Sequence, residues 1–294
     1  MTAMRILCAS KAIGPQTVLG ESPIWDPLRA CLWWIDIESC KLHRFDPGAG
    51  ACSSHPLPGR PGLVALHPSG DLVLGIECTI GRYDPVCRTF TPVVVIGAEA
   101  GIRINDGSCD PGGRLWFGTM DNSLSHPKGS LFRLDPAGVI PVGDRLVASN
   151  GPAISGDGRR LFHCDSIGRR ILQYQVDAEG QYGNLSVFRH FTQEEGLPDG
   201  MACDVEGGLW VALWGSGSVI RLDHRARTSA KVNLPVKQVT ACTFAGPDLG
   251  DLYVTTASLG MTKRGLTASP GAGRLYRCKP GWTGLSATPV LHLS

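Results

Sequence analysis

Short apolar runs alternate along this chain with clusters of Gly, Pro and Asp, as in CLWWID and RLFHCD with the turns around them. The runs are rich in β-branched and aromatic residues, and no stretch shows apolar residues sustained at spacings of three and four. Short runs of this kind between turn-forming residues predict β-strands, and the missing helical period predicts almost no helix. The pattern therefore indicates an all-β chain.

The predicted strands belong to a unit that recurs along the chain. Each copy has an anchor residue, a small turn and an apolar strand, followed by a second strand that ends in a corner similar to Arg-Leu-Asp. Six copies begin at Trp25, His67, Asp110, Ser155, Asp204 and Ala245. Their spacing of about 41 to 49 residues is typical of propeller blades. A closed ring leaves only short strand edges, so we predict a six-bladed β-propeller; a two-sheet sandwich would not explain the regular spacing.

No linker or charge run interrupts the repeat, so residues 1–294 are expected to form a single propeller domain. The apolar segments RILCAS and TVLG, which precede the first copy, contain no complete repeat. We expect them to add a strand to the blade that contains the C-terminal segment.

Composition indicates which binding partners and which cellular compartment to expect. The net charge of +2, with both signs interspersed, offers no footprint for nucleic acid, and no 18-residue apolar run predicts a membrane span. The opening MTAMRILCAS is too short an apolar run for a secretory signal peptide. The eleven cysteines are scattered without a CxxC pair, which favours free thiols in a reducing cytoplasm. A monomer or small homo-oligomer is expected.

Four copies carry an oxygen-bearing side chain five positions before the anchor. These side chains are Glu21 before Asp26, Asn105 before Asp110, Asn150 before Ser155 and Asp199 before Asp204. Equal offsets in a closed repeat place side chains on one ring, and two carboxylates with two amides suit a hard divalent cation. Taken singly, each is an ordinary loop or turn residue; the shared offset is what indicates a site. The second and sixth copies have Gly62 and Thr240 near this position, so the polar groups occupy only part of the ring.

The usual motifs of other hydrolases are missing from the sequence. It contains no GxSxG, HExxH or GxxxxGK, and its eight histidines are unpaired. Attack by water assisted by a metal ion is the hydrolytic route that remains. Trp116 and Trp214 are expected to belong to the blade cores rather than to a sugar-binding surface.

Several segments resemble the senescence marker protein/gluconolactonase/luciferin-regenerating enzyme family. They are GESPIW, RINDGSCDPGGRLWFGTM, SNGPAIS, LPDGMACDVEGGLWVALWGSGSVIRLD and VTACTFAGPDLGDLYVTTA. These motifs occur in order over nearly the whole chain, and their residues are more similar to those of bacterial sugar lactonases than to those of the animal proteins. The resemblance implies a six-bladed propeller with one divalent cation in its central channel and activity on sugar lactones.

The resemblance also implies roles for individual residues. Carried over by motif, the metal ligands fall on Glu21, Asn150 and Asp199, and Asp199 is the general base. The substrate-contacting pair falls on Arg103 and Asn105.

A further acidic residue after GTM falls on Asp121. This position varies in the family, and Asp is shorter than Glu, so its carboxylate reaches less far toward a substrate.

The sequence thus favours hydrolysis of a sugar lactone to its aldonic acid, assisted by one divalent cation: calcium, zinc, manganese, magnesium or iron(II). Two alternatives stay open at this point. One is a metal-binding propeller without catalysis, because a fold alone never establishes function. The other is a metal-dependent hydrolase of aryl esters or organophosphates. Nothing in the spacing chooses between pentonolactones and hexonolactones.

Overall fold

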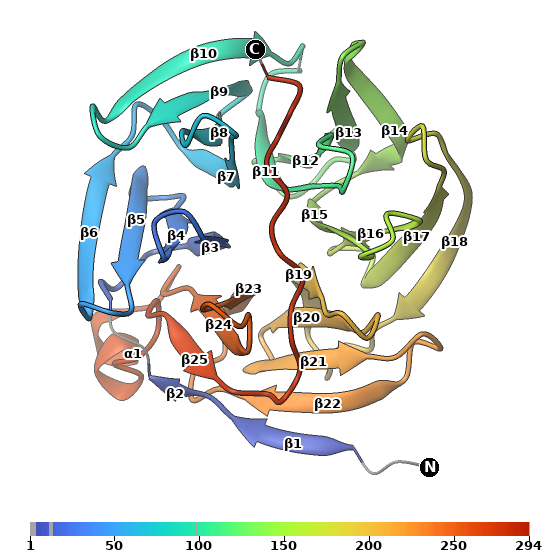
Figure 1. Ribbon diagram of the computed structural model, residues 1–294. Helices are drawn as coiled ribbons and strands as arrows, with labels where there is room; N and C mark the ends of the chain where they lie inside the picture. Colours follow the sequence, from blue (N-terminus) through green and yellow to red (C-terminus); the bar gives the residue numbers. More distant parts are fainter. Residues whose placement is uncertain (1–3, 12–13, 98, 294) are drawn as a thin grey trace.

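Six β-sheets surround a central channel in the computed structural model, which describes residues 4–11, 14–97 and 99–293 (Figure 1). Five of the sheets have four strands and one has five. The predicted six-bladed propeller is therefore confirmed.

One strand from each blade lines the channel. These innermost strands are β3 (Gly20–Asp26), β7 (Pro61–Leu66), β11 (Ile102–Cys109), β15 (Ser149–Ile154), β19 (Leu197–Cys203) and β23 (Val239–Ala245). Each contacts the next, and β23 contacts β3, which closes the ring.

The remaining strands follow outward in each blade. The second strands are β4 (Cys31–Asp36), β8 (Leu72–Ile76), β12 (Leu115–Asp121), β16 (Arg160–Asp165), β20 (Leu209–Trp214) and β24 (Asp251–Thr256). The third strands are β5 (Lys41–Asp46), β9 (Thr79–Asp84), β13 (Gly129–Asp135), β17 (Arg170–Val176), β21 (Ser218–Leu222) and β25 (Tyr276–Cys278). The outer strands of the first five blades are β6 (Ala51–Pro56), β10 (Thr89–Val95), β14 (Gly138–Leu146), β18 (Tyr182–His190) and β22 (Thr228–Asn233).

The N-terminal segment completes two blades rather than one. Strand β2 (Ser10–Lys11) pairs with β25 and supplies the outer strand of the sixth blade, as expected. Strand β1 (Arg5–Cys8) instead pairs in parallel with β22 and adds a fifth strand to the fifth blade. The expectation that the whole RILCAS segment joins the C-terminal blade was therefore wrong. The unpaired edge of β22 offers N–H and C=O groups that β1 satisfies.

The recurring anchor residue explains why the repeat is visible in the sequence. Asp110 Oδ1 accepts hydrogen bonds from the backbone N–H groups of Gly112 at 2.8 Å and Arg114 at 3.1 Å. Its Oδ2 accepts from Trp116 Nε1 at 2.9 Å, so the turn is tied to the second strand. Trp116 is fully buried, which confirms its predicted place in a blade core. Trp214, at the end of β20, is only partly buried.

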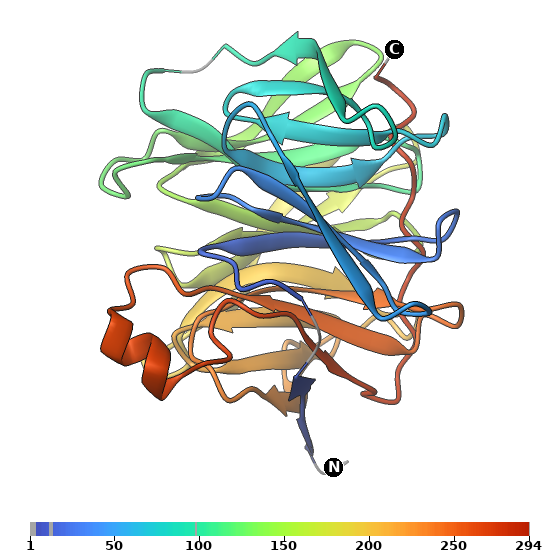
Figure 2. The same ribbon diagram turned by 90° about the vertical axis from the view of Figure 1, so that its left-hand side faces the viewer.

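The last segment of the chain runs across one face of the ring (Figures 1 and 2). The N–H groups of Gly284, Val290 and Leu291 donate to the carbonyl groups of Leu249, Leu66 and Gly113, which belong to three different blades. The short helix α1 (Lys263–Ala268) projects from the opposite face (Figure 2). Among the described residues, no helix is long and apolar enough to cross a membrane.

Candidate functional site

Every innermost strand has a β-bulge at the same level of the channel. The pairing with the second strand shifts between Glu21 and Ile24, Pro61 and Leu63, Ile104 and Asp106, Asn150 and Ala153, Pro198 and Met201, and Val239 and Cys242. A bulge re-aims the side chains around it. The four side chains singled out by the repeat offset lie at four of these bulges, so that offset is the distance from bulge to turn.

Three buried carboxylates and one buried guanidinium lie close enough in this ring to affect one another. Glu21, Asp106 and Asp199 are only 7%, 7% and 8% exposed. Burial, with repulsion from the neighbouring carboxylates, raises the pKa of Glu21 and of Asp199 well above the ordinary range. Burial raises the pKa of Asp106 to about 6. Arg103 is also buried, and the loss of water lowers its pKa to about 10.

The two amides form a hydrogen-bonded pair across the third and fourth blades. Asn105 Nδ2 donates to Asn150 Oδ1 at 2.5 Å and to the Ser149 carbonyl oxygen at 3.0 Å. Asn150 Nδ2 in turn donates to Ser166 Oγ at 2.9 Å. The Asn150 oxygen therefore lies on the side of Asn105, and its nitrogen lies on the side of the fourth blade's turn.

Asp106 holds neighbouring backbones together instead of presenting free oxygens. It accepts from the N–H of Gly107 at 2.7 Å and from that of Gly151 at 2.8 Å. Gly151 has φ +40°, and a Cβ there would lie 2.9 Å from the Asp199 carbonyl oxygen. Only glycine suits this position, where three blades meet beside the site.

Asp199 has a buried oxygen, Oδ1, that finds no hydrogen-bond partner among the described residues. Its backbone carbonyl accepts from Cys164 Sγ at 3.2 Å, which fixes the strand without using Oδ1. A buried carboxylate oxygen without a donor is costly unless a cation or water satisfies it.

The charges in the ring also suit a cation. With all three carboxylates ionised and Arg103 protonated, the net charge is −2, which one divalent cation balances. No cluster of three or more His, Cys, Asp or Glu side chains close enough to share a metal is found in the part of the chain that the structure describes. The predicted ligand set holds only two such side chains and relies on Asn150 for a third oxygen. The residues thus fit a hard cation through mixed carboxylate and amide oxygens.

Arg103 keeps most of its hydrogen-bonding capacity free. Its Nη1 donates to the adjacent Ile104 carbonyl oxygen at 2.9 Å, and it forms no salt bridge within the described residues. Glu21, Glu38 and Glu77 lie near enough to favour its charge without pairing with it. A buried guanidinium with spare donors is suited to hold oxygen atoms of a ligand.

Asp121 faces its own loop. Its carboxylate accepts from Ser123 Oγ at 2.5 Å and from the N–H groups of Ser125 at 3.1 Å and His126 at 2.9 Å. These donors, the Ser123 hydroxyl first, hold the pKa of Asp121 well below its usual range. The carboxylate of Asp121 is thus held by its own loop, and its contact with substrate stays a prediction.

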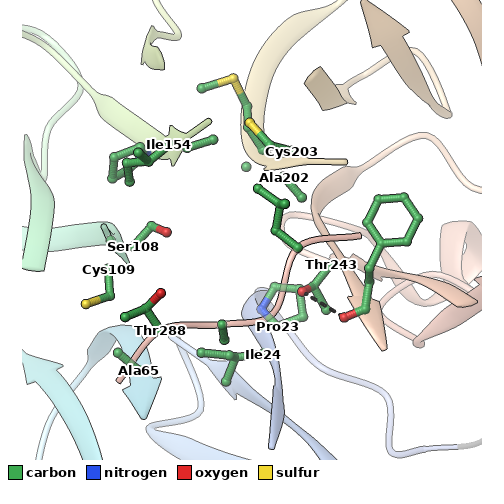
Figure 3. Close-up of a pocket in the computed structure, with 18 of the residues that line it drawn as sticks. Pro23, Ile24, Ala65, Ser108, Cys109, Ile154, Ala202, Cys203, Thr243 and Thr288 are labelled. Atoms are coloured by element: carbon green, nitrogen blue, oxygen red, sulfur yellow. Dashed lines mark hydrogen bonds between the residues drawn. The ribbon is translucent and has the colours of Figure 1, made fainter. Parts of the chain in front are cut away.

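A cavity of about 290 Å³ lies in the channel between the bulge ring and the C-terminal segment (Figure 3). Its wall includes Ser108, Cys109, Thr243 and Thr288, together with apolar side chains. Asp106 also lines it, but Glu21, Asn105, Asn150 and Asp199 do not. This cavity and the bulge ring are therefore two levels of one channel, and most of the charged chemistry belongs to the ring.

Sequence reasoning missed two groups that hold the site. Ser166 and Cys164 lie 32 and 35 residues from their partners in β19, and neither stands at a repeat offset. Asp106 had a weak signal, because it follows Asn105 in an ordinary turn-forming sequence.

Comparisons with known proteins agree with this architecture. The chain is 34% identical over 286 residues to regucalcin of Gallus gallus, covering 94% of this chain and 95% of that one. It is 30% identical over 279 residues to the L-arabinolactonase of Azospirillum brasilense, covering 92% and 91%. The crystal structure of a calcium-binding protein, regucalcin from Agrobacterium tumefaciens, superposes with a TM-score of 0.93 at 27% identity, covering 98% and 99%.

A family model described as SMP-30/Gluconolactonase/LRE-like region matches residues 19–258. This range contains all six bulges and every candidate site residue. The chain belongs to the SMP-30/gluconolactonase/LRE-like family.

Proposed function

We propose that this protein is a sugar lactonase that hydrolyses an aldonolactone to the aldonic acid with the help of one divalent cation. The observation that carries the proposal is the bulge ring, where the unpartnered Asp199 oxygen lies in the same charged cluster as Glu21 and Arg103. Similarity to an enzyme named for its action on L-arabinolactone supports the substrate class.

Glu21, Asn150 and Asp199 would hold the cation through two carboxylate oxygens and one amide oxygen. When bound, a divalent cation polarises the lactone carbonyl and stabilises the charge that develops on its oxygen. Two carboxylates would neutralise the ion while the neutral amide leaves it electrophilic. An opposite charge at this place also relieves the repulsion among the buried carboxylates.

Asp199 would act as the general base. Beside a cation it stays ionised, and it takes a proton from the attacking water as the water oxygen bonds to the carbonyl carbon. The ring C–O bond then breaks, and the ring oxygen leaves as a hydroxyl group with the proton returned by Asp199. One water is consumed and one aldonic acid is formed, so the carboxylate ends as it began.

Arg103 and Asn105 would bind and orient the lactone. Arg103 has free donors on a rigid planar group, which can hold two ligand oxygens at once. The Nδ2 of Asn105 donates hydrogen bonds to Asn150 and Ser149, so its Oδ1 would accept a hydrogen bond from a substrate hydroxyl. The two residues are separated by one position on β11, next to its bulge.

The direct test is a pH-drop assay of the purified protein on a panel of aldonolactones, after removal of metal and after addition of each divalent cation. Turnover of a pentono- or hexonolactone that chelator abolishes and a cation restores is the expected result. No turnover above background with any cation would contradict the proposal and favour a binding protein. Faster turnover of aryl esters or organophosphates than of lactones would assign the site to that class of hydrolase.

A further inference from the structure

Asn150 offers a cation one oxygen and one nitrogen, and only the oxygen can be a ligand. An Asn side chain can rotate to exchange the two, so something must fix its orientation. The groups around Asn150 form a chain of hydrogen bonds that does so. They connect β15, the turn after β16 and β19.

The chain of hydrogen bonds ends on a group that can only accept. Ser166 Oγ donates its single proton to the Pro198 carbonyl oxygen at 2.7 Å. Ser166 then has only lone pairs left for Asn150, whose Nδ2 lies 2.9 Å away. Asn150 must therefore turn its nitrogen toward Ser166 and its oxygen toward Asn105. Asn105 Nδ2, which can only donate, meets that oxygen at 2.5 Å.

We infer that Ser166 is a positioning residue that keeps the oxygen of Asn150 directed into the bulge ring. Ser166 is only 5% exposed, so water does not readily replace its hydroxyl. Its partner Pro198 directly precedes Asp199, and the same hydroxyl thus ties together the strands of two proposed cation ligands. The inference rests on the proposed role of Asn150 as a cation ligand.

The test measures cation affinity rather than turnover. Metal-free full-length protein is titrated with calcium and, separately, with manganese by isothermal titration calorimetry. Ser166→Ala is expected to weaken binding by about 10- to 100-fold, the usual cost of losing a group that orients a metal ligand. Ser166→Cys keeps the volume but hydrogen-bonds weakly, and it should shift the affinity in the same direction if the alanine variant does not fold.

Ser149→Ala is the matched control. Ser149 is a fully buried serine in the same blade, and its hydroxyl lies 2.6 Å from His163 Nε2. Its contact with the site is made by its backbone carbonyl, which accepts from Asn105 and which the substitution leaves in place. This variant loses a comparable hydrogen bond, so the metal-free protein should lose similar stability while cation affinity stays within about twofold. Equal loss of affinity in both variants would mean that Ser166 acts only through general stability.

A double-mutant cycle separates orientation of the amide from placement of the strand. In an Asn150→Asp background both terminal atoms of the side chain are oxygens, so orientation no longer matters. Ser166→Ala should then cost less than about threefold in affinity. An equal cost in both backgrounds would overturn the inference, as would a wild-type protein that binds neither cation. If the cycle behaves as expected but no lactone is hydrolysed, the proposed reaction fails and the role of Ser166 stands.

Discussion

The six bulges around the channel share one backbone geometry but fall into two kinds. Those in the first, third, fourth and fifth blades present Glu21, Asn105, Asn150 and Asp199. Those in the second and sixth blades present Gly62 and Thr240 at the matching position. The difference shows how a symmetric ring becomes a one-sided site.

The second and sixth bulges serve packing. A Cβ on Gly62 would lie 2.1 Å from the Ile104 carbonyl oxygen, so the backbones of β7 and β11 are in direct contact. Thr240 donates to the Gly20 carbonyl oxygen at 2.6 Å and thus joins β23 to β3. These two positions form packing contacts between neighbouring strands, whereas the other four carry polar side chains that line the channel. The following experiments test this division of roles.

The largest effect is expected from Asp199→Asn. The amide keeps an oxygen for a cation but cannot accept the proton of the attacking water, so kcat should fall by about 10²–10⁴-fold. The measurement is kcat on the best lactone at saturating cation, with bound metal checked by calorimetry. A rate near that of the wild type, with metal present, would show that another group is the base.

In the metal-free protein the site carboxylates should contribute less stability as the pH rises. Asp106 has its pKa raised from 3.8 to about 6, so the native state keeps a proton that the unfolded state has lost in this window. The contribution of Asp106 to the free energy of unfolding therefore falls between about pH 4 and pH 6, and that of Glu21 and Asp199, whose pKa is raised as well, falls further above it. The buried His43 and His163, whose pKa is lowered to about 4, act in the opposite direction in the same window. For Asp106 alone the shift is worth about 3 kcal/mol, or roughly 5–10 °C in Tm.

Thermal unfolding between pH 4 and pH 8 is measured for the chelated and for the cation-saturated protein, and the difference isolates the site carboxylates because the two histidines titrate in both. Saturating cation should abolish most of the fall that these carboxylates cause. If Tm depends on pH in the same way with and without cation, the carboxylates of Glu21 and Asp199 do not share a cation.

Gly62→Ala should destabilise the fold by about 1–3 kcal/mol, because the added methyl group meets backbone that cannot move freely. Gly183→Ala is the matched control: it lies in the outer strand β18, and a Cβ there meets nothing within 4 Å. Chemical unfolding of both variants gives the comparison. Equal stability of the two would show that the second bulge is not a close contact.

Much of this architecture could be predicted from the sequence, for a local reason. The anchor Asp residues, the turns and the buried second strands depend on contacts within one repeat, such as Asp110 with Trp116. The outer strands could not be predicted from the sequence. For example, β10 is largely exposed, so no core constrains its pattern of apolar and polar residues. The equal offset placed four polar residues on one ring because every repeat has its bulge at the same distance from its turn to within one residue.

The rest of the site depends on contacts between blades, which no local pattern encodes. Ser166 meets Pro198 across 32 residues, and Asp106 meets Gly151 across 45. Asp121 is a related case, because a motif assigned it to substrate contact but did not show that its own loop supplies three donors to its carboxylate.

The smallest effect is expected from Thr240→Val. Thr240 stands at the position where three other blades carry the proposed ligands, but its hydroxyl lies 2.6 Å from the Gly20 carbonyl oxygen and 2.9 Å from Thr255 Oγ1. Valine removes these hydrogen bonds at similar volume, which should cost about 1 kcal/mol and lower Tm by roughly 2–4 °C. Cation affinity, measured by calorimetry beside the melting curve, should stay close to that of the wild type. A large loss of affinity with little change in Tm would place Thr240 among the polar bulges, and the division into two kinds would then be incorrect.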